Sequence, residues 1–397
     1  MVDPVSSGAS SAEFRHWWNN ERFRGVLYQF LLMAMVAGIG WFLVANTLTN
    51  LNARHIATGF GFLDREAGFG ISEHLVPYLP SDSYFRAFEV GLLNTLEVAV
   101  IGIVLTTLLG LVMGIARLSH NWLVARLASA YVEAMRNVPV LLLLLFCYSL
   151  ITVSLPLSRN AFNLFDCIFL SNRGLRVPAM IWDDSAVMVV STLALAVAAS
   201  FLVGVWARRR QEKTGRYFPV LWSSLGLIAG LPLIAFLATG AHLSFDVPHM
   251  AGFNFAGGST VSPEFAALLL GLVVYTGAFI AEIVRSGILA VSYGQTEAAL
   301  ALGLSRMQVL RLVVLPQSLR VIIPPLTSQY LNLVKNSPLA VAIGFPDLVS
   351  VANTAINQTG QAVEGVSIIM GVYLAISLIL SFLMNWYNKR VALRGGR

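Results

Sequence analysis

Long apolar stretches separated by short polar segments dominate the chain of 397 residues. A helix that crosses a bilayer needs about 20 consecutive apolar residues, and the sequence contains about eight such stretches. They lie at about residues 26–45, 90–116, 137–155, 186–207, 219–241, 264–284, 321–343 and 366–387. The pattern predicts an all-α polytopic membrane protein with about eight transmembrane helices.

The composition and the placement of charge agree with this prediction. Hydrophobic residues make up 57% of the chain and charged residues only 12%, whereas soluble domains carry about 25% charged residues. If both termini are cytoplasmic, most of the 26 Lys and Arg residues fall in cytoplasmic loops or tails, as the positive-inside rule requires. The net charge of +6 is spread over these loops, which argues against a nucleic-acid-binding face.

One polar interruption, residues 286–325, contains two short amphipathic helices rather than a span. Gly303 is suited to a left-handed residue that ends the first helix, and Pro316 is expected to limit the second. Two Ser-x-x-Gln spacings predict capping boxes, at Ser292 with Gln295 and at Ser305 with Gln308. The helix pair should therefore lie outside the hydrocarbon and offer a small projection to a partner.

Residue patterns typical of catalysis or cofactor binding are missing from the sequence. None of the three lysines follows a glycine in a phosphate-binding loop, and the six histidines have no metal-ligand spacing. We expect no metal or cofactor site and no ATPase site in this chain; if the protein takes part in ATP-driven transport, a partner subunit must hydrolyse the ATP. Cys147 is expected to be a buried packing residue, and a bridge between Cys147 and Cys167 stays open.

The projection resembles the cytoplasmic signature of permease subunits of ATP-binding-cassette (ABC) importers. That signature is Glu-Ala-Ala, three residues, Gly, nine residues, Ile, one residue and Leu-Pro; here Val313 takes the Ile position. The resemblance implies that the signature residues couple the permease to its ATPase. They are Glu297, Ala298, Ala299, Gly303, Leu315 and Pro316.

Flanking segments look like the polar amino acid permeases, the histidine and glutamine group. The resemblance is carried by residues 281–285, 294–295 and 335–337. Residues 59–72, 94–96 and 324–349 look closer still to the Q-type permease of bacterial general L-amino-acid uptake systems. The similarity covers roughly residues 25–390.

This resemblance implies an ABC type I importer core of five spans in the bacterial inner membrane. The core would use the second, third, sixth, seventh and eighth spans, with an additional N-terminal helix and an inserted helical hairpin at about 156–263. The implied regions are a cytoplasmic tail (1–25), a first helix with an outer loop (26–89), a permease domain (90–390) that contains the coupling segment (286–325), and a second tail (391–397). The implied partners are a homologous second permease subunit, a cytoplasmic ATPase dimer, a periplasmic amino-acid-binding protein and an L-amino acid substrate.

Polar residues inside the predicted spans are candidates for the substrate path. A charge at mid-bilayer costs about 3 kcal/mol or more and usually faces an interior route. Lys335 could pair with the substrate carboxylate, or it could be neutralised by Glu97 or another acid of the bundle. Glu97 and Asn94 could meet the substrate ammonium group. The other candidates are Gln329, Asn332, Asn336 and Ser337; of these, Gln329, Asn332 and Asn336 share a helical face.

Two further sets of residues have spacings with structural interpretations. Glu133 with Arg136 and Glu282 with Arg285 have the i, i+3 spacing of local ion pairs, for which we expect anchoring rather than gating. Gly110 with Gly114 and Gly226 with Gly230 have the GxxxG spacing, for which we expect local packing rather than a dimer interface.

Two other classes of protein fit parts of the pattern. An ion-gradient-driven secondary amino acid transporter would also have many spans and an internal lysine, but it would not need the projection. A membrane-embedded enzyme or scaffold would need catalytic side chains clustered at one depth, and the sequence contains no such cluster.

Overall fold

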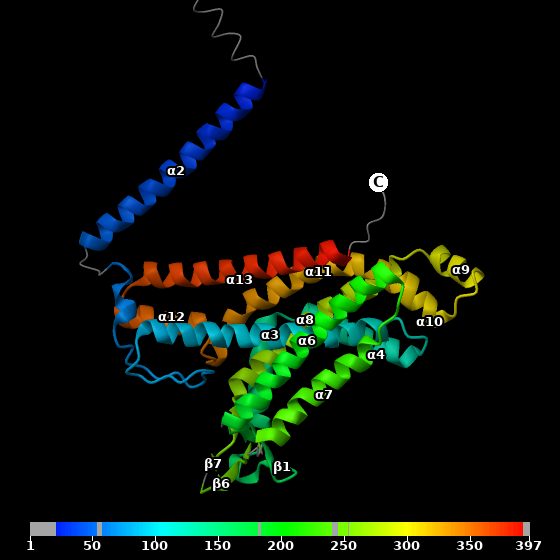
Figure 1. The fold of residues 1–397 in the computed structure, drawn as a ribbon. Helices are drawn as coiled ribbons and strands as arrows, with labels where there is room; N and C mark the ends of the chain where they lie inside the picture. Colours follow the sequence, from blue (N-terminus) through cyan, green and yellow to red (C-terminus); the bar gives the residue numbers. More distant parts are fainter. Residues whose placement is uncertain (1–20, 54–57, 182–183, 240–244, 253, 392–397) are drawn as a thin grey trace, which may run out of the picture. The chain divides into compact units, whose positions relative to one another are not determined.

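The computed structural model describes residues 21–53, 58–181, 184–239, 245–252 and 254–391. The predicted tails at 1–25 and 391–397 lie mostly outside these residues. The described residues, drawn in Figure 1 with their helices and strands, divide into two compact units. Unit 1 comprises the described residues within 1–70, 79–88 and 351–371, and unit 2 comprises those within 71–78, 89–350 and 372–397.

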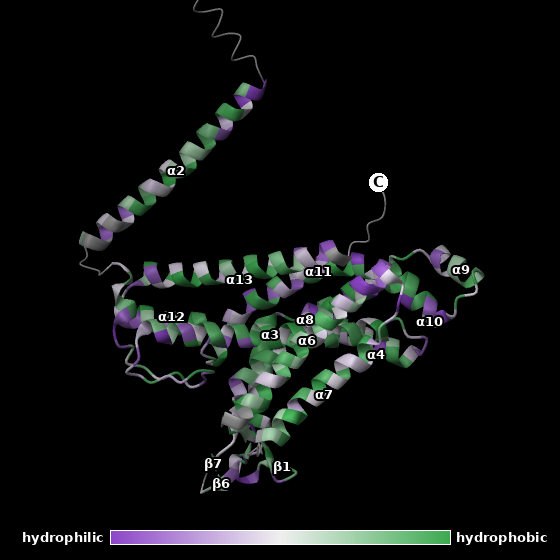
Figure 2. Ribbon diagram, in the orientation of Figure 1, coloured by the Kyte–Doolittle hydropathy of each residue, from purple (hydrophilic) through white to green (hydrophobic). Residues whose placement is uncertain are grey.

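Helices long and apolar enough to span a membrane number seven among the described residues, or up to eight if one bent pair is a single span. The seven correspond to α2 (Glu21–Ala53), α3 (Tyr84–Ala116), α6 (Asp184–Thr214), α7 (Val220–Thr239), α8 (Pro263–Leu289), α11 (Leu315–Asn336) with the segments that flank it, and α13 (Ala362–Val391). The predicted helical membrane fold is confirmed. Figure 2 shows α7 as almost wholly apolar, whereas α9 (Tyr293–Ala301) mixes polar and apolar residues.

The bent pair consists of α4 (Trp122–Asn137) and the segment Val140–Ser154, which begins with α5 (Val140–Ser149), and the chain bends by 108° between them. Pro139 lies at the break, in the N-cap position of α5. A proline is disfavoured inside a continuous helix, which favours a break here. The Asn121 side chain begins α4 by accepting bonds from the N–H groups of Leu123 (3.0 Å) and Val124 (3.4 Å). The predicted third span matches α5 and the π-helical turn Leu150–Ser154, whereas α4 was not predicted because it is amphipathic.

Short strands flank the inserted helical hairpin, a feature that the sequence analysis missed. One antiparallel sheet has the order β1-β2-β3-β8, and two further pairs join β4 to β5 and β6 to β7. The strands are β1 (Phe162–Leu164), β2 (Ile168–Ser171), β3 (Gly174–Val177), β4 (Ala179–Met180), β5 (Phe245–Asp246), β6 (His249–Ala251), β7 (Asn254–Ala256) and β8 (Ser259–Val261). The turn between β1 and β2 places Phe165 and Asp166 at positive φ. It lacks the glycine that usually marks such a hairpin.

Unit 1 has a small aromatic core of its own. Phe62, in the 3₁₀ turn Phe60–Asp64, packs edge-on against Tyr84 and Phe88 at centroid distances of 5.7 and 6.3 Å. The Tyr84 hydroxyl donates to Gln358 Oε1 at 2.7 Å, and Gln358 belongs to α12 (Leu348–Thr359). These contacts tie together parts of unit 1 that are far apart in the sequence.

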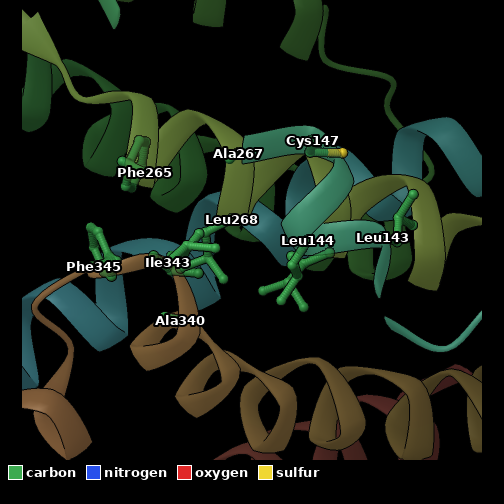
Figure 3. Close-up of a cluster of buried hydrophobic side chains, with 11 residues drawn as sticks. Leu143, Leu144, Cys147, Phe265, Ala267, Leu268, Ala340, Ile343 and Phe345 are labelled. Atoms are coloured by element: carbon green, nitrogen blue, oxygen red, sulfur yellow. The ribbon is translucent and has the colours of Figure 1, made fainter. Parts of the chain in front are cut away.

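Unit 2 is organised around α8, which packs against α4, α5 and α11. Ser262 starts α8 by accepting the Phe265 N–H, and Pro263 occupies the first turn, where it needs no hydrogen-bond partner. Figure 3 shows the main apolar cluster, in which Leu144 of α5, Leu268 of α8 and Phe345 are buried together. Cys147 is buried in the same cluster and is a free thiol, so its predicted packing role is confirmed. Cys167 is also free.

Glycines allow α3 to approach α8 closely. A Cβ added to Gly110 would lie 2.4 Å from Ile280 Cγ2, and one added to Gly114 would lie 2.7 Å from Val284 Cβ. The predicted local packing role of this pair is therefore confirmed. A Cβ on Gly226 or Gly230 would meet no atom within 4 Å.

The substitution Gly110→Ala should lower the apparent melting temperature in detergent, because the new methyl group collides with buried Ile280 at the base of its side chain. Overpacking of this kind costs about 1–3 kcal/mol. Gly226→Ala is the matched control and should leave the melting temperature unchanged or slightly higher, since alanine favours a helix by about 1 kcal/mol over glycine. Equal melting temperatures for the two variants would contradict the assigned α3–α8 contact.

Candidate functional site

The segment between α8 and α11 forms two short helices, as predicted. The first, α9, ends at Ala301, and Gly303 in the turn after it has φ +81°. The Leu304 N–H reaches back to Ala299 O at 3.2 Å, so the turn closes the helix in the manner of a Schellman motif. Figure 1 shows α9 and α10 (Arg306–Val309) beyond the adjacent ends of α8 and α11.

Only one of the two predicted capping boxes forms. The Ser305 N–H donates to Gln308 Oε1 at 2.8 Å, and the Gln308 N–H donates to Ser305 Oγ at 3.4 Å. The prediction for Ser292 was wrong, because its side chain caps nothing and the Gln295 N–H bonds to the Ser292 backbone carbonyl instead.

The prediction that Pro316 limits the second helix was also wrong. From α10 the chain continues through a π-helical turn, Leu310–Val314, directly into α11, so Pro316 lies near the start of a long helix. A helix of 22 residues is about 33 Å long and already matches the hydrocarbon thickness. The candidate span that contains α11 runs from Arg306 to Ile343, which is longer than a bilayer requires.

The signature residues differ in exposure: Glu297, Ala298, Gly303 and Leu315 are exposed, Pro316 is half-buried, and Ala299 is buried. Glu297 and Ala298 are exposed on α9, whereas Ala299 is only 5% exposed and Gly303 supplies the turn. Leu315 and Pro316 begin α11, separated from α9 by α10 and the π-helical turn. The exposed glutamate is thus placed where a separate protein can reach it.

Exposed apolar side chains on this projection were missed by the sequence analysis. Leu302, Tyr293 and Met307 are 82%, 72% and 70% exposed. Tyr293 begins α9, Leu302 directly follows α9, and Met307 lies on α10. Their signal in the sequence was weak, because exposed and packed apolar residues alternate in an amphipathic segment.

The candidate path residues of α11 differ in accessibility. Lys335 and Asn332 are exposed and Gln329 and Asn336 are half-buried, all in the last two turns of the helix. Among the described residues, no acidic side chain forms an ion pair with Lys335. The alternative in which Glu97 neutralises this lysine therefore lacks support from the structure.

Two of the predicted path residues are buried and form hydrogen bonds within unit 2. Asn94 is 0% exposed, and its Nδ2 donates to the backbone carbonyls of Glu73 (2.8 Å) and Pro346 (2.9 Å). Ser337 is also 0% exposed, and its hydroxyl donates to Val334 O at 2.9 Å. The Asn94 bonds join α3 to two other segments, whereas the Ser337 bond is local; the prediction that both line the substrate path stays a prediction.

Carboxylates gather around Asn94. Glu97 is half-buried one turn further along α3, and Glu73 accepts a bond from the Ser262 hydroxyl at 2.5 Å. Burial raises the pKa of Glu73, and the nearby Glu97 and Glu264 raise it further, while the bond from Ser262 opposes both effects. Among the described residues, no group of three or more His, Cys, Asp or Glu side chains is arranged to hold a metal ion.

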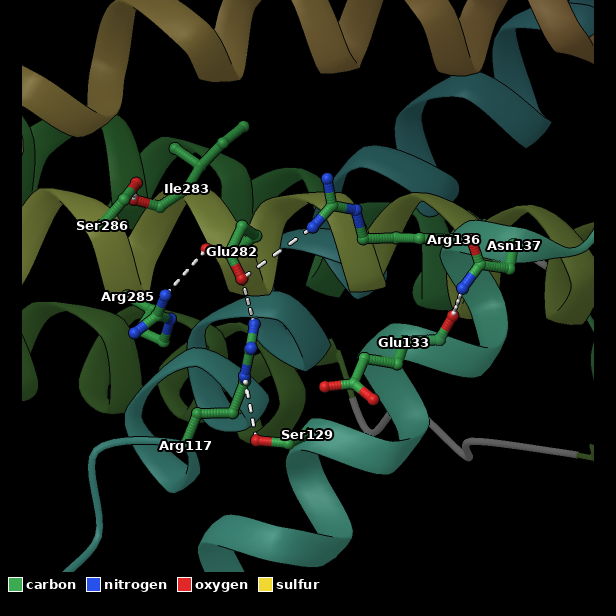
Figure 4. Close-up of polar contacts among 9 residues, drawn as sticks. All are labelled: Arg117, Ser129, Glu133, Arg136, Asn137, Glu282, Ile283, Arg285 and Ser286. Carbon is green, nitrogen blue, oxygen red and sulfur yellow. Dashed lines mark hydrogen bonds and ion pairs between the residues drawn. The ribbon is translucent and has the colours of Figure 1, made fainter.

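A second polar cluster lies near the other end of α8, where Glu282 binds three arginines (Figure 4). Arg117 at the end of α3 forms a close ion pair with Glu282, Arg285 Nη2 lies 3.2 Å from its Oε1, and Arg136 of α4 lies 3.9 Å from its Oε2. One carboxylate therefore ties α3 and α4 to α8 immediately before the coupling segment.

The predicted pair Glu282–Arg285 is confirmed and its anchoring role is extended to three helices. The prediction for Glu133–Arg136 was wrong, because Arg136 turns toward Glu282. In Figure 4 no ion pair joins the Glu133 carboxylate to Arg136.

Asp347 is a buried acid beside the Asn94 contacts. It is 0% exposed and its Oδ1 accepts the Ser350 N–H at 2.8 Å, which caps the start of α12. The Tyr373 hydroxyl donates to its Oδ2 at 3.4 Å. Burial raises the pKa of Asp347 from the ordinary 3.8 to about 6, although these hydrogen bonds oppose the rise.

Comparison with known proteins gives a family match and full-length relatives. Residues 106–393 match the model of the family "Binding-protein-dependent transport system inner membrane component". The chain is 47% identical over 392 residues to the general L-amino acid transport system permease protein AapQ of Rhizobium johnstonii, covering 99% of this chain and 98% of the relative. It is 42% identical to the glutamate/glutamine/aspartate/asparagine transport system permease protein BztB of Rhodobacter capsulatus, covering 94% and 95%.

Among solved structures, an amino acid ABC transporter crystallised with histidines is 21% identical. The match covers 77% of this chain and 95% of that chain, with a TM-score of 0.46.

The raised pKa of Asp347 predicts a pH dependence of stability. Between pH 4 and pH 6 the folded chain binds a proton that the unfolded chain has released, so stability decreases as the pH rises through the pKa of about 6. From pH 5 to pH 7.5 the loss should be about 1 kcal/mol. In detergent, the apparent melting temperature should fall over this range by more in the wild type than in Asp347→Asn, which cannot ionise. Identical pH profiles would contradict the assigned burial.

Proposed function

The chain belongs to the family of binding-protein-dependent transport system inner membrane components, and from this premise we propose that it is the permease subunit of an ATP-driven importer of L-amino acids. Full-length similarity to an L-amino acid permease, at 47% identity over 392 residues, is the observation that carries this proposal. In the same proposal both termini are cytoplasmic, which puts the projection formed by α9 and α10 on the side where ATP is available.

A cytoplasmic ATPase dimer is the proposed partner of the projection. The exposed Glu297 supplies a charge for a cationic or polar group of the ATPase, and Tyr293, Leu302 and Met307 supply apolar area around it. An exposed apolar cluster outside the hydrocarbon is typical of a protein-binding surface. The chain itself binds no ATP in this scheme, since it has no phosphate-binding loop.

The exposed polar stripe at the end of α11 is the proposed wall of the substrate path. Lys335, Asn332 and the half-buried Gln329 would be costly to expose to lipid. A second, homologous permease subunit would face this stripe and enclose the path. Lys335 would then meet the substrate carboxylate, while Glu97 would be available for the ammonium group. Asn94 and Ser337 position the surrounding segments rather than touch the substrate.

A transport cycle follows from these assignments. A periplasmic binding protein delivers the amino acid to the outer side of the permease pair, and closure of the ATPase on ATP moves α9 and α10. Because α9 follows α8 directly and α10 leads into α11, the movement passes to both helices. The ion-gradient-driven alternative gives this projection no role.

The charge reversal Glu297→Lys should abolish ATP-coupled uptake, because like charges would meet at the proposed ATPase contact. Uptake of labelled L-amino acids into proteoliposomes with the ATPase and binding protein measures the effect, and insertion should be normal. Glu21→Lys is the matched control, an exposed glutamate in the first turn of α2, and should transport as the wild type does. Wild-type uptake by Glu297→Lys would refute the docking assignment. Uptake that persists without the ATPase would support the secondary transporter.

Removing the charge at Lys335 tests the substrate path. Lys335→Met should lower uptake by about tenfold or more, because a charged hydrogen bond to the substrate contributes about 1.5–3 kcal/mol. The complex should still assemble, and its melting temperature should not fall, since this exposed lysine has no described partner. Lys335→Arg keeps the charge and should retain more uptake than Lys335→Met. Unchanged uptake in Lys335→Met would remove Lys335 from the path.

A further inference from the structure

The connection between α10 and α11 is wound as a π-helix. Over Leu310–Val314 the turn is widened, and the Leu315 N–H bonds to Leu310 O, five residues back rather than four. Such turns are rare and amount to one extra residue accommodated within an α-helix. The position is notable, because this turn joins an exposed projection to a membrane-spanning helix.

Pro316 explains why the widening occurs here. In a continuous α-helix the residue at 316 would donate its N–H to Leu312 O, but proline has no N–H and its ring would collide with that carbonyl. A π-helical turn shifts the carbonyl away from the ring. Ser318 adds a second local adjustment, because its buried hydroxyl donates to Val314 O at 2.8 Å.

The extra residue determines which way the projection faces. Each residue of an α-helix advances the chain by about 100° and 1.5 Å, and the π-helical turn absorbs about that rotation. The two sides of the turn are held very differently. On the C-terminal side of the turn, α11 is packed closely against α8, where a Cβ on Gly287 would lie only 2.3 Å from Ile322 Cγ1. On its N-terminal side, Glu297 and Leu302 are exposed.

We propose that the π-helical turn at Leu310–Val314, held open by Pro316, sets the rotational register between the docking helices and α11. Pro316 acts as a positioning residue for coupling and does not itself touch the ATPase. If the turn closed to an α-helix with all residues retained, Glu297 would rotate by about 100° away from its contact. The proposal rests on the proposed function, since it assumes that Glu297 docks on the ATPase.

A cycle of four proteins tests the register directly. Pro316→Ala restores the N–H and allows the α-helix to close, so it should lower ATP-coupled uptake by at least about tenfold, as displacements of only about 1 Å can do. Deletion of Leu312 alone should also impair uptake, because the shortened turn forces the proline ring against a carbonyl. Combining the deletion with Pro316→Ala removes the extra residue and the proline together. The double variant should recover uptake to within a few-fold of the wild type, because the register is restored.

Recovery in the double variant cannot arise from misfolding of the single variants, so it supports the register. Wild-type uptake by Pro316→Ala overturns the proposal, and so does a double variant no better than either single variant. Co-purification of the ATPase should fall in both single variants and return in the double variant. Failure of the docking assignment is separable, since it would show as normal uptake in Glu297→Lys. Loss of uptake in Glu297→Lys together with wild-type uptake in Pro316→Ala would refute only the proposed rotational register and leave the docking assignment standing.

Discussion

Close contact around α8 is the constraint on which the rest of unit 2 depends. In a bilayer the hydrophobic effect does not drive helices together, so close packing and polar contacts between them must do so. Gly110 and Gly114 let α3 reach α8, Gly271 admits Leu144 of α5, and Gly287 admits Ile322 of α11. With these surfaces in contact, a movement of α8 would also move the helices packed against it. That rigidity is what a coupling segment directly after α8 requires.

The polar contacts at the two ends of the helices around α8 differ in kind: one set consists of ion pairs and the other of hydrogen bonds to backbone groups. Glu282 neutralises part of the charge of three arginines at the end that leads into α9. At the other end, Asn94, Asp347 and Ser337 are fully buried and hold backbone groups. The first cluster joins helices to one another, and the second joins helices to loops. Rearrangement at either end would have to preserve the hydrogen bonds of buried groups, because leaving such a group unpaired costs about 1–3 kcal/mol.

Much of this architecture could be predicted because membrane spans follow from length and apolar composition alone. Residues 90–116 and 264–284 correspond closely to α3 and α8, and Gly303 ends its helix as its backbone freedom indicated. The short strands were missed because strands of two to four residues are too short for an alternating pattern to stand out. The prediction that Pro316 limits a helix was wrong because an isolated proline usually indicates a helix end, whereas this fold accommodates the proline with a π-helical turn. Asn94 illustrates a further limit: sequence identifies an intramembrane amide but not whether backbone carbonyls already occupy it.

The inserted pair α6 and α7 stands apart from this system of contacts. Each makes its most extensive contact with the other, and most of their described side chains face outward. Two apolar helices that pack mainly against each other can insert into a bilayer together in one folding step. Their sequence is then constrained mainly by compatibility with lipid, whereas the helices around α8 are constrained by the close contacts at their glycines.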